Sequence, residues 1–243
     1  MQQHHRVRPV YCAMAAVWIT LVVVSGCAVP GYNEREAMLF EDKLHTEFKV
    51  ASFSPKSSHF SGGSGVGVRM SYEYEYGMHY GFEITSIEDV EGAPYSGPGA
   101  LSSPDAIRDI GEQSLSRSDR RSFTINFDWD VPISQDGSLP YFRYGFGVGG
   151  LYSKNSLNQG FLDAVEAGSP GTFVEVTDQL MFLFSPSASI RWDLAGDSLT
   201  FIAEAQYDIA SHDLIIDLNS DGDIAGEVDY GGLGAYVGID YSF

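Results

Sequence analysis

The chain has 243 residues, enough for one large all-β domain or two small ones. It carries 33 acidic against 14 basic residues, and this excess argues against a nucleic-acid partner, which would need clustered cations to neutralise phosphates. Its 27 glycines, 14 tyrosines and 15 phenylalanines favour short strands and aromatic belts over a helical bundle.

The first 26 residues have the pattern of an export signal, with the positively charged head "MQQHHRVRPV" followed by the apolar core "YCAMAAVWITLVVV". The next residues, "VVSGC", resemble the lipobox of bacterial lipoproteins, in which a small residue precedes a cysteine that becomes acylated. That resemblance implies cleavage before Cys27 and a lipid on its thiol; an ordinary signal peptide cut slightly later is the alternative. We expect residues 27–43 to be a lipid-anchored spacer, in which Asn33 and Glu36 have the spacing of a capping box for a short helix.

Residues 44–243 show the alternation of β-strands. Eight segments have about the length of a tilted membrane strand: 44–54, 64–76, 78–88, 120–131, 139–152, 178–193, 198–210 and 231–243. The connections at 77, 132–138 and 194–197 are short, whereas the others are longer and polar. This sorting is typical of an eight-stranded antiparallel outer-membrane β-barrel with short periplasmic turns, long extracellular loops and both termini in the periplasm.

Each predicted strand has one apolar and one polar face. In the segment 120–131, for example, Phe123, Ile125 and Phe127 alternate with Thr124 and Asn126. Aromatic residues near the strand ends suit a lipid–water boundary. Placing Arg143 or Arg191 at mid-bilayer would cost roughly 2–4 kcal/mol each, so the apolar face should contact lipid and the polar face the lumen.

The segment "GIDYSF" at 238–243 resembles the carboxy-terminal signal by which outer-membrane barrels are recognised for assembly, with Gly238, Tyr241 and Phe243 in its characteristic positions. Together with the eight strands, the chain resembles the OmpA/OmpX/OmpW-like class of small outer-membrane barrels of Gram-negative bacteria. The resemblance implies outer-membrane lipid and the barrel assembly machinery as partners, and a monomer.

The predicted lumen is rich in charge, with acids in excess of bases. Alternation directs inward Glu47, Lys49, Arg69, Glu73, Glu75, Glu83, Asp128, Asp130, Arg143, Arg191, Glu204, Asp208 and Asp240. These charges indicate either a plug of ion pairs or a small cation-preferring pore or ligand-binding barrel. We favour the plug, because eight strands leave an interior just wide enough for side chains and buried charges must be paired.

Two short segments carry nucleophile and base together, His59-Phe60-Ser61 and Ser211-His212-Asp213. Some eight-stranded barrels modify lipid A with such residues, so a lipid A-modifying enzyme is a further alternative. Adjacent strand residues point apart, however, and Ser211 cannot pair simply with His212. We therefore predict no enzymatic activity, and a structural or surface-interaction role in the cell envelope.

The sharpest local motif is "DLNSDGDI" at 217–224, which resembles the start of an EF-hand calcium loop. Its oxygen ligands would be Asp217, Asn219, Asp221 and Asp223. The bidentate acid at the twelfth position is absent, because Val228 stands there. The alternative, which we favour, is an acidic hairpin loop with an Asp-Gly turn. We expect no other cofactor.

Overall fold

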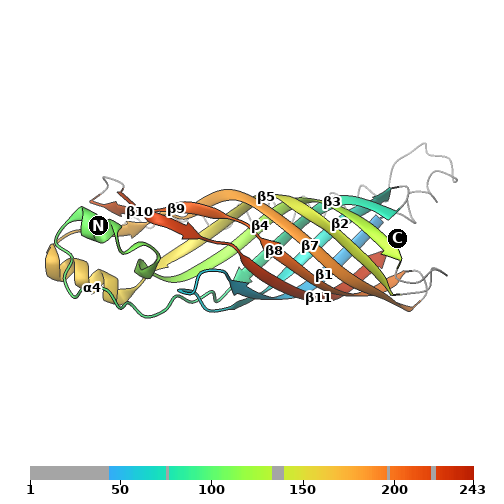
Figure 1. Cartoon of the computed structure of the whole chain (residues 1–243), viewed down its shortest axis with the longest axis horizontal. Helices are drawn as coiled ribbons and strands as arrows, with labels where there is room; N and C mark the ends of the chain where they lie inside the picture. Colours follow the sequence, from blue (N-terminus) through green and yellow to red (C-terminus); the bar gives the residue numbers. More distant parts are fainter. Residues whose placement is uncertain (1–43, 75–76, 133–139, 196–197, 220–222) are drawn as a thin grey trace, which may run out of the picture. The chain divides into compact units, whose positions relative to one another are not determined.

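The computed structural model describes residues 44–74, 77–132, 140–195, 198–219 and 223–243. Most of them belong to β-strands (Figure 1). Within these ranges, no helix is long and apolar enough to cross a membrane. The predicted signal segment, the spacer and Cys27 lie outside the described residues, so lipid anchoring stays a prediction.

Eight strands close into one barrel in the order β1-β11-β8-β7-β5-β4-β3-β2, and every neighbouring pair is antiparallel. Their bounds are β1 (Leu44–Pro55), β2 (Gly63–Tyr74), β3 (Met78–Glu88), β4 (Leu115–Pro132), β5 (Tyr141–Leu157), β7 (Gln179–Ala195), β8 (Leu199–Asp208) and β11 (Gly232–Ser242). The predicted fold class is confirmed. The main difference is that β4 and β5 continue about five residues beyond the predicted segments, away from the short connections.

The two ends of the barrel differ in their connections. At one end, called here the short-turn end, short connections join β2 to β3, β4 to β5 and β7 to β8. The start of β1 and the end of β11 meet there too, since the Phe243 amide donates to the Leu44 carbonyl at 3.0 Å (Figure 1). The opposite end, called the long-loop end, carries the other four connections, and those from β3 to β4, from β5 to β7 and from β8 to β11 are the longest in the barrel.

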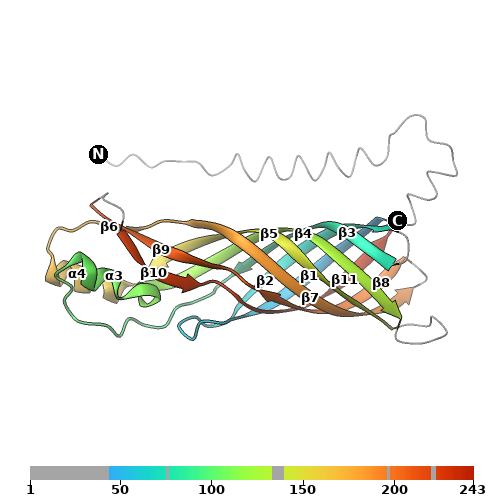
Figure 2. The same ribbon diagram turned by 45° about the horizontal axis from the view of Figure 1, so that its top comes forward.

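The longer connections were expected to be polar loops, and this expectation was wrong for about half of their length. They contain α3 (Pro104–Arg108), η2 (Gly111–Ser114), α4 (Gln159–Gly168), β6 (Val174–Val176), β9 (Ser211–Leu218) and β10 (Asp223–Asp229). The strands β10, β9 and β6 form a separate three-stranded sheet with β9 in the middle. Figure 2 shows this sheet and both α-helices gathered at the long-loop end, and we call the group the cap.

Local sequence explains why the cap is ordered. In α4, Asn158 caps the first turn by accepting a hydrogen bond from the Gly160 amide at 3.0 Å, and Phe161, Ala164 and Val165 recur at helical spacing on its buried face. In β9, Leu214 and every second residue after it turn to the same buried side. Both elements therefore bury one apolar face against the other parts of the cap.

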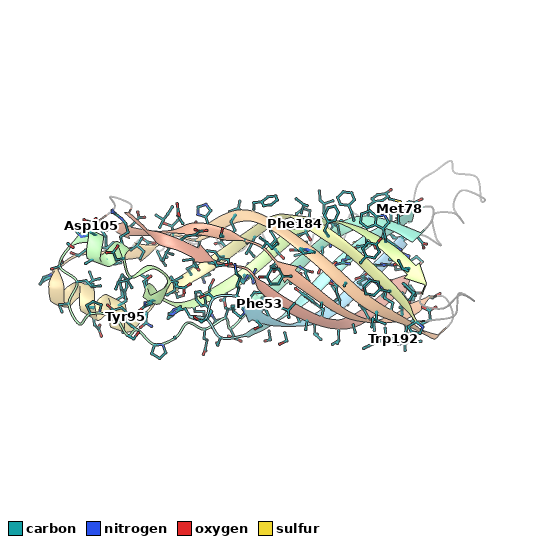
Figure 3. All side chains as sticks on the ribbon, in the orientation of Figure 1. Phe53, Met78, Tyr95, Asp105, Phe184 and Trp192 are labelled. Carbon is teal, nitrogen blue, oxygen red and sulfur yellow. The ribbon has the colours of Figure 1, made fainter. Side chains whose placement is uncertain are left out.

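The apolar side of the barrel changes along its length. On β1, Phe48 and Val50 are exposed on the outer face, whereas beyond them Ala51 and Phe53 are buried inside. The same change occurs on β3, β4 and β5: their outer faces are apolar toward the short-turn end, and carry the exposed residues Glu88, Arg121 and Lys154 toward the long-loop end. Figure 3 shows this outer surface, with Met78 and Trp192 near the short-turn end and Phe184 midway.

The exposed apolar surface near the short-turn end confirms the predicted orientation of the strand faces. On β4 it runs over nine residues from Phe123 to Val131, in which five apolar residues alternate with four buried or half-buried polar ones. A tilted strand of this length spans about the 25 Å of a membrane barrel's apolar band. Aromatic pairs lie on it, among them Trp129 with Tyr144 and Trp192 with Phe201.

Candidate functional site

The interior of the barrel near the short-turn end is filled by paired charges. All the barrel strands contribute to what we call the ion-pair network: Glu47, Lys49, Arg69, Glu83, Asp128, Asp130, Arg143, Arg191, Glu204 and Asp240. Apart from Asp130, whose side chain is 20% exposed, all of them are buried. These side chains lie inside the barrel, on the side to which strand alternation directs them.

Lys49 and Arg69 form the first centre of the network. The Lys49 ammonium lies 2.7 Å from Glu83 Oε1 and 2.8 Å from Glu204 Oε1. Arg69 Nε donates to Glu83 Oε2 at 2.7 Å, and its Nη2 lies 3.3 Å from Glu204 Oε1. Two cations therefore share two carboxylates that come from opposite sides of the barrel, β3 and β8.

Glu47 forms the second centre. Its Oε1 accepts from Arg191 Nη2 at 2.6 Å and from Arg143 Nη1 at 3.4 Å, while Arg69 Nε lies 3.9 Å from its other oxygen. Arg191 continues to Asp240 Oδ2 at 3.1 Å. One fully buried carboxylate thus stands among three guanidinium groups and links the two centres.

Two histidines that the sequence reading missed complete the network at the short-turn end. His45 Nδ1 lies 3.1 Å from Asp240 Oδ2, and its Nε2 lies 3.4 Å from Glu73, which is partly exposed. His79 Nε2 lies 2.8 Å from Asp130 Oδ2, and its ring meets that of His45 edge to face. Strand alternation could have found both, since His45 precedes Glu47 by two residues and His79 precedes Glu83 by four.

Some buried oxygens of the network have no partner among the described residues. Asp128 Oδ1 and Asp240 Oδ1 are two of them. Asp128 has Arg69 as a cation partner at 3.4 Å, and Gly145 stands directly across from it on β5. A side chain at Gly145 would collide with Asp128 Oδ1 and the Phe127 carbonyl, so the glycine makes room for this carboxylate. The network is therefore packed, and its acids outnumber its bases.

Above the network, Arg120 and Asp208 make a separate buried pair, with Arg120 Nη2 3.1 Å from Asp208 Oδ2. Asp208 was predicted to point inward and does so; Arg120 was missed, because the predicted strand began there. Asp208 Oδ1 also accepts from Ser185 and Gln206, at 2.8 and 3.0 Å. The pair marks the boundary between the charged part of the interior and the apolar part.

Toward the long-loop end the interior is apolar and continuous with the cap. One cluster joins the inward residues of the barrel to the buried faces of the cap: Ala51, Phe53, Ile87, Leu151, Met181, Leu183, Leu101, Ile107, Leu115, Phe161, Ala164, Val165, Leu214, Ile216, Leu218 and Val228 are among its members. The predicted charge-rich lumen is therefore found toward the short-turn end, and the apolar part of the interior was not predicted. The lumen is filled by ion pairs toward the short-turn end and by a hydrophobic core toward the long-loop end.

The remaining sequence predictions have mixed outcomes. Glu75 lies outside the described residues. Tyr241 and Phe243 lie at the end of β11 with their rings 4.7 Å apart and half exposed, and Gly238 pairs with Lys49 across the barrel seam. Their part in assembly stays a prediction, because no contact within the described chain reports on it.

The predicted nucleophile and base pairs are not assembled in the described residues. His59 Nε2 lies 2.8 Å from the Leu115 carbonyl, and His212 Nδ1 lies 3.0 Å from the Asp213 carbonyl. Neither contact involves a serine hydroxyl. His59 instead contacts the backbone at the start of β4, and His212 contacts the backbone of β9 in the cap.

The calcium hypothesis is not tested, because Asp221 and the side chain of Asp223 lie outside the described residues. Asn219 adopts a positive φ of 56°, and its side-chain oxygen accepts from the Phe173 amide. Asp217 stands directly across from Glu175 of β6. Within the described residues no group of three or more metal-ligating side chains is arranged around a common point.

The surface of the cap nearest the barrel carries polar contacts of ordinary strength. Lys56 Nζ lies 2.5 Å from Asp229 Oδ2, and this hydrogen bond raises the pKa of the lysine ammonium. Burial raises the pKa of the Tyr230 phenol to about 12, although its oxygen accepts from Asn155 at 3.2 Å. The phenol of Tyr230 is therefore neutral at physiological pH. It accepts a hydrogen bond from Asn155 of β5 and so links the segment before β11 to the barrel.

Comparison with known proteins identifies the fold. No protein-family model matches the chain, and no curated protein matches its sequence. Among solved structures, the outer membrane protein OprG of Pseudomonas aeruginosa is similar with a TM-score of 0.52 and 10% identity, over 84% of this chain and 97% of that one. A major outer membrane protein of Thermus thermophilus is similar with a TM-score of 0.50 and 9% identity, over 82% of this chain and 99% of that one. At these identities the likeness concerns the fold alone.

Proposed function

We propose that this chain, which has the fold of the small eight-stranded outer-membrane β-barrels, is a non-conducting barrel of the outer membrane with a structural or surface-interaction role. The observation that carries the proposal is that side chains fill the whole interior, with the ion-pair network toward the short-turn end and an apolar core toward the long-loop end. An ion would have to cross both the ion-pair network and the apolar core beneath the cap. Each obstructs it for a different reason.

The ion-pair network opposes conduction because its charges already have partners. Glu47, Lys49, Arg143 and Arg191 are at most 2% exposed, and each lies within hydrogen-bonding distance of an opposite charge. A permeating cation would have to separate such pairs in surroundings of low dielectric, where the loss of a partner is costly. The apolar core then offers no oxygen ligands to replace an ion's water.

The outer surface supports the orientation in the membrane. The apolar band around the short-turn end suits lipid, and the exposed charges of β3, β4 and β5 toward the long-loop end suit water. We therefore place the cap outside the cell and the meeting point of β1 and β11 in the periplasm. Lipid anchoring through Cys27 and a monomeric state belong to the same proposal.

Two features of the long-loop end support a non-enzymatic role as part of this proposal. His59 and His212 hold backbone carbonyls rather than hydroxyl nucleophiles. The cap's surface is formed by an ordered sheet and short helices, which can present fixed side chains to a partner. A surface that is already folded loses little conformational entropy on binding, so the cap is suited to recognition.

Planar-bilayer recording of the purified protein tests the proposal. We expect no steady current under conditions in which a general porin conducts. Steady cation-selective current in the wild type, abolished by Asp128→Asn with Glu204→Gln, would overturn it in favour of the pore. Asp119→Asn is the matched control, because this carboxylate lies on β4 but outside the ion-pair network.

Protease treatment of intact cells tests the orientation separately. Cleavage should be confined to the cap, and a fragment containing the barrel strands should stay in the outer-membrane fraction. Replacement of Cys27 by alanine should abolish incorporation of radiolabelled acyl chains. Recovery of the protein from the soluble periplasm would contradict the localisation.

A further inference from the structure

The apolar outer face of the barrel extends much further along β7 than along β3, from which it is separated by β5 and β4. On β3 this face covers residues 78–84, and the next outward residues, Ser86 and Glu88, are polar. On β7 every second residue from Leu180 to Leu194 is apolar and at least half exposed or partly buried on the outside. Both faces begin beside a short turn, so the difference lies toward the long-loop end.

The height of these two faces can be compared with that of a bilayer. At about 3.3 Å per residue and a tilt of about 40°, the face of β7 rises about 35 Å and that of β3 about 15 Å. The apolar band of a membrane barrel is about 25 Å tall. The upper end of the β7 face therefore extends beyond a band of ordinary height.

This upper end carries the most exposed large apolar side chains of the described residues, Leu180 at 73% and Phe182 at 67%. Ile209, which follows β8 and bridges to Phe184 of β7, is 51% exposed. We call Leu180, Phe182 and Ile209 the β7 patch. Figure 3 shows Phe184, the next outward residue of β7, midway along the described structure. Exposed apolar patches mark contact with a membrane or with another protein.

The surroundings of the β7 patch favour lipid. A protein-docking patch has a polar rim, but the outward residues of β7 at 184–194 continue the patch into the lipid-facing band without a polar interruption. The first exposed polar residue on its other side is Asp178. The hydroxyl of Tyr152, which stands opposite Leu180 on β5, donates to Asp178 Oδ2 at 2.5 Å. A tyrosine whose polar tip is held on the water side suits a lipid–water boundary.

We propose that acyl chains of outer-leaflet lipid cover the β7 patch. The boundary of the lipid then lies at Tyr152 and Asp178 on this side of the barrel, and below Glu88 on the side of β3. The inference rests on the proposed function, because it requires the long-loop end to face the outside of the cell. Lipid around the barrel is therefore thicker against β7 than against β3, a mismatch that bilayers accommodate at modest cost.

Photochemical crosslinking in intact cells identifies what covers the patch. Leu180→benzoylphenylalanine and Phe182→benzoylphenylalanine place a photoreactive ketone there, and mass spectrometry of the purified adducts gives the mass of the partner. We expect adducts with an acyl-bearing lipid at both positions. Adducts with a protein, including a second copy of this chain, would overturn the inference, and so would the absence of any adduct.

Two matched positions separate this inference from the proposed function. Phe127→benzoylphenylalanine lies in the middle of the apolar face of β4 and should form lipid adducts. Glu88→benzoylphenylalanine, at the long-loop end of β3, should form none. Lipid adducts at Phe127 without lipid adducts at the β7 patch would overturn only the inference. No lipid adduct at Phe127 would overturn the membrane location itself.

Bilayer thickness gives a second test with ordinary residues. Leu180→Ser with Phe182→Ser should lower the urea midpoint of the refolded protein in vesicles of long-chain phosphatidylcholine, and leave it at the wild-type value in short-chain vesicles that do not reach the patch. Phe173→Ser is the control, since Phe173 is 61% exposed but lies outside the barrel strands, and it should leave both midpoints unchanged. An equal effect of the double variant in both lipids would refute the inference.

Discussion

The barrel interior is filled by charged side chains near the short-turn end and by apolar side chains near the long-loop end. Near the short-turn end, the space is filled by charged side chains, and the surface outside is apolar. Near the long-loop end, Ala51, Phe53 and Leu151 point inward, whereas Arg121 and Lys154 are exposed outside. The first part is built for lipid surroundings and the second for water, although the same strands run through both.

This difference teaches that the surroundings, and not the barrel topology, decide what fills a β-barrel. A strand in lipid must keep its apolar residues outside, so the inner face is left to polar groups that satisfy one another. Above the lipid the usual hydrophobic driving force returns, and the inner face becomes an ordinary core. The cap completes that core, because the barrel strands alone leave its open end uncovered.

The largest expected effect comes from removing the carboxylate at the centre of the ion-pair network. Glu47→Ala leaves Arg143 and Arg191 without their shared partner and should destabilise the barrel by about 3–5 kcal/mol. Urea unfolding of the protein refolded in lipid vesicles measures the loss. Glu88→Gln, at an exposed position on β3, is the control and should change little. A small effect of Glu47→Ala would mean that water readily replaces the missing carboxylate.

A cavity in the apolar part should act mainly on the cap. Leu214 is fully buried on β9, and Leu214→Ala should cost about 2–5 kcal/mol. We expect faster proteolysis of the cap while the barrel keeps its mobility on unboiled gels. If the cap lost its protease resistance and the barrel lost its gel mobility together, cap and barrel would unfold as one cooperative unit. The two parts of the interior would then not differ in stability.

A smaller effect is expected from the helix cap of α4. Asn158→Ala removes the hydrogen bond to the Gly160 amide and should cost about 0.5–2 kcal/mol. Asn158→Asp keeps the accepting oxygen and should retain most of the stability, although the hydrogen bond from Nδ2 to the Ala93 carbonyl is lost. The rate of proteolysis within α4 measures both variants. Equal loss in the two would assign the effect to the Ala93 contact instead.

The smallest effect should be a gain in stability. Glu175 and Asp217 stand directly opposite each other on β6 and β9, and like charges in this arrangement destabilise a sheet. Glu175→Lys should stabilise the cap by about 0.2–1 kcal/mol at low salt, and less at high salt. Protease resistance without divalent ions measures the gain. If millimolar calcium turned the gain into a loss, the calcium hypothesis for Asp217 would be supported.

The strands and their faces were predictable because alternation is a local property of the sequence. Once Arg143 and Arg191 face the lumen, the positions of Glu47, Asp128 and Glu204 follow from the period of two. What alternation could not give was the partner of each charge, which depends on how far each strand is displaced along its neighbours. Arg69 meets Glu204 across the lumen, for example, although the two are 135 residues apart.

The cap was missed although its signals are legible. Leu214, Ile216 and Leu218 alternate as a half-buried strand does, and Phe161, Ala164 and Val165 follow helical spacing. They stand in segments that were assigned to loops because the barrel pattern requires loops there. The shift of apolar residues from Val50 to Ala51 on β1 carries the same information, since the apolar residues change side at that point whereas the buried side of the strand stays the same. The short helix α3, with five residues, depends mainly on tertiary contacts.

The seam between β1 and β11 has a consequence for how the chain folds. His45 and Asp240, which meet across it, are 195 residues apart, so the barrel closes through one of the longest-range pairings available to the chain. Such non-local pairing slows folding, because the chain loses the entropy of loop closure before the stabilising contacts between the two strands form. Until it forms, both strands present unpaired edges that can join other chains. The seam is therefore the step at which a folding helper would have the greatest effect on the yield.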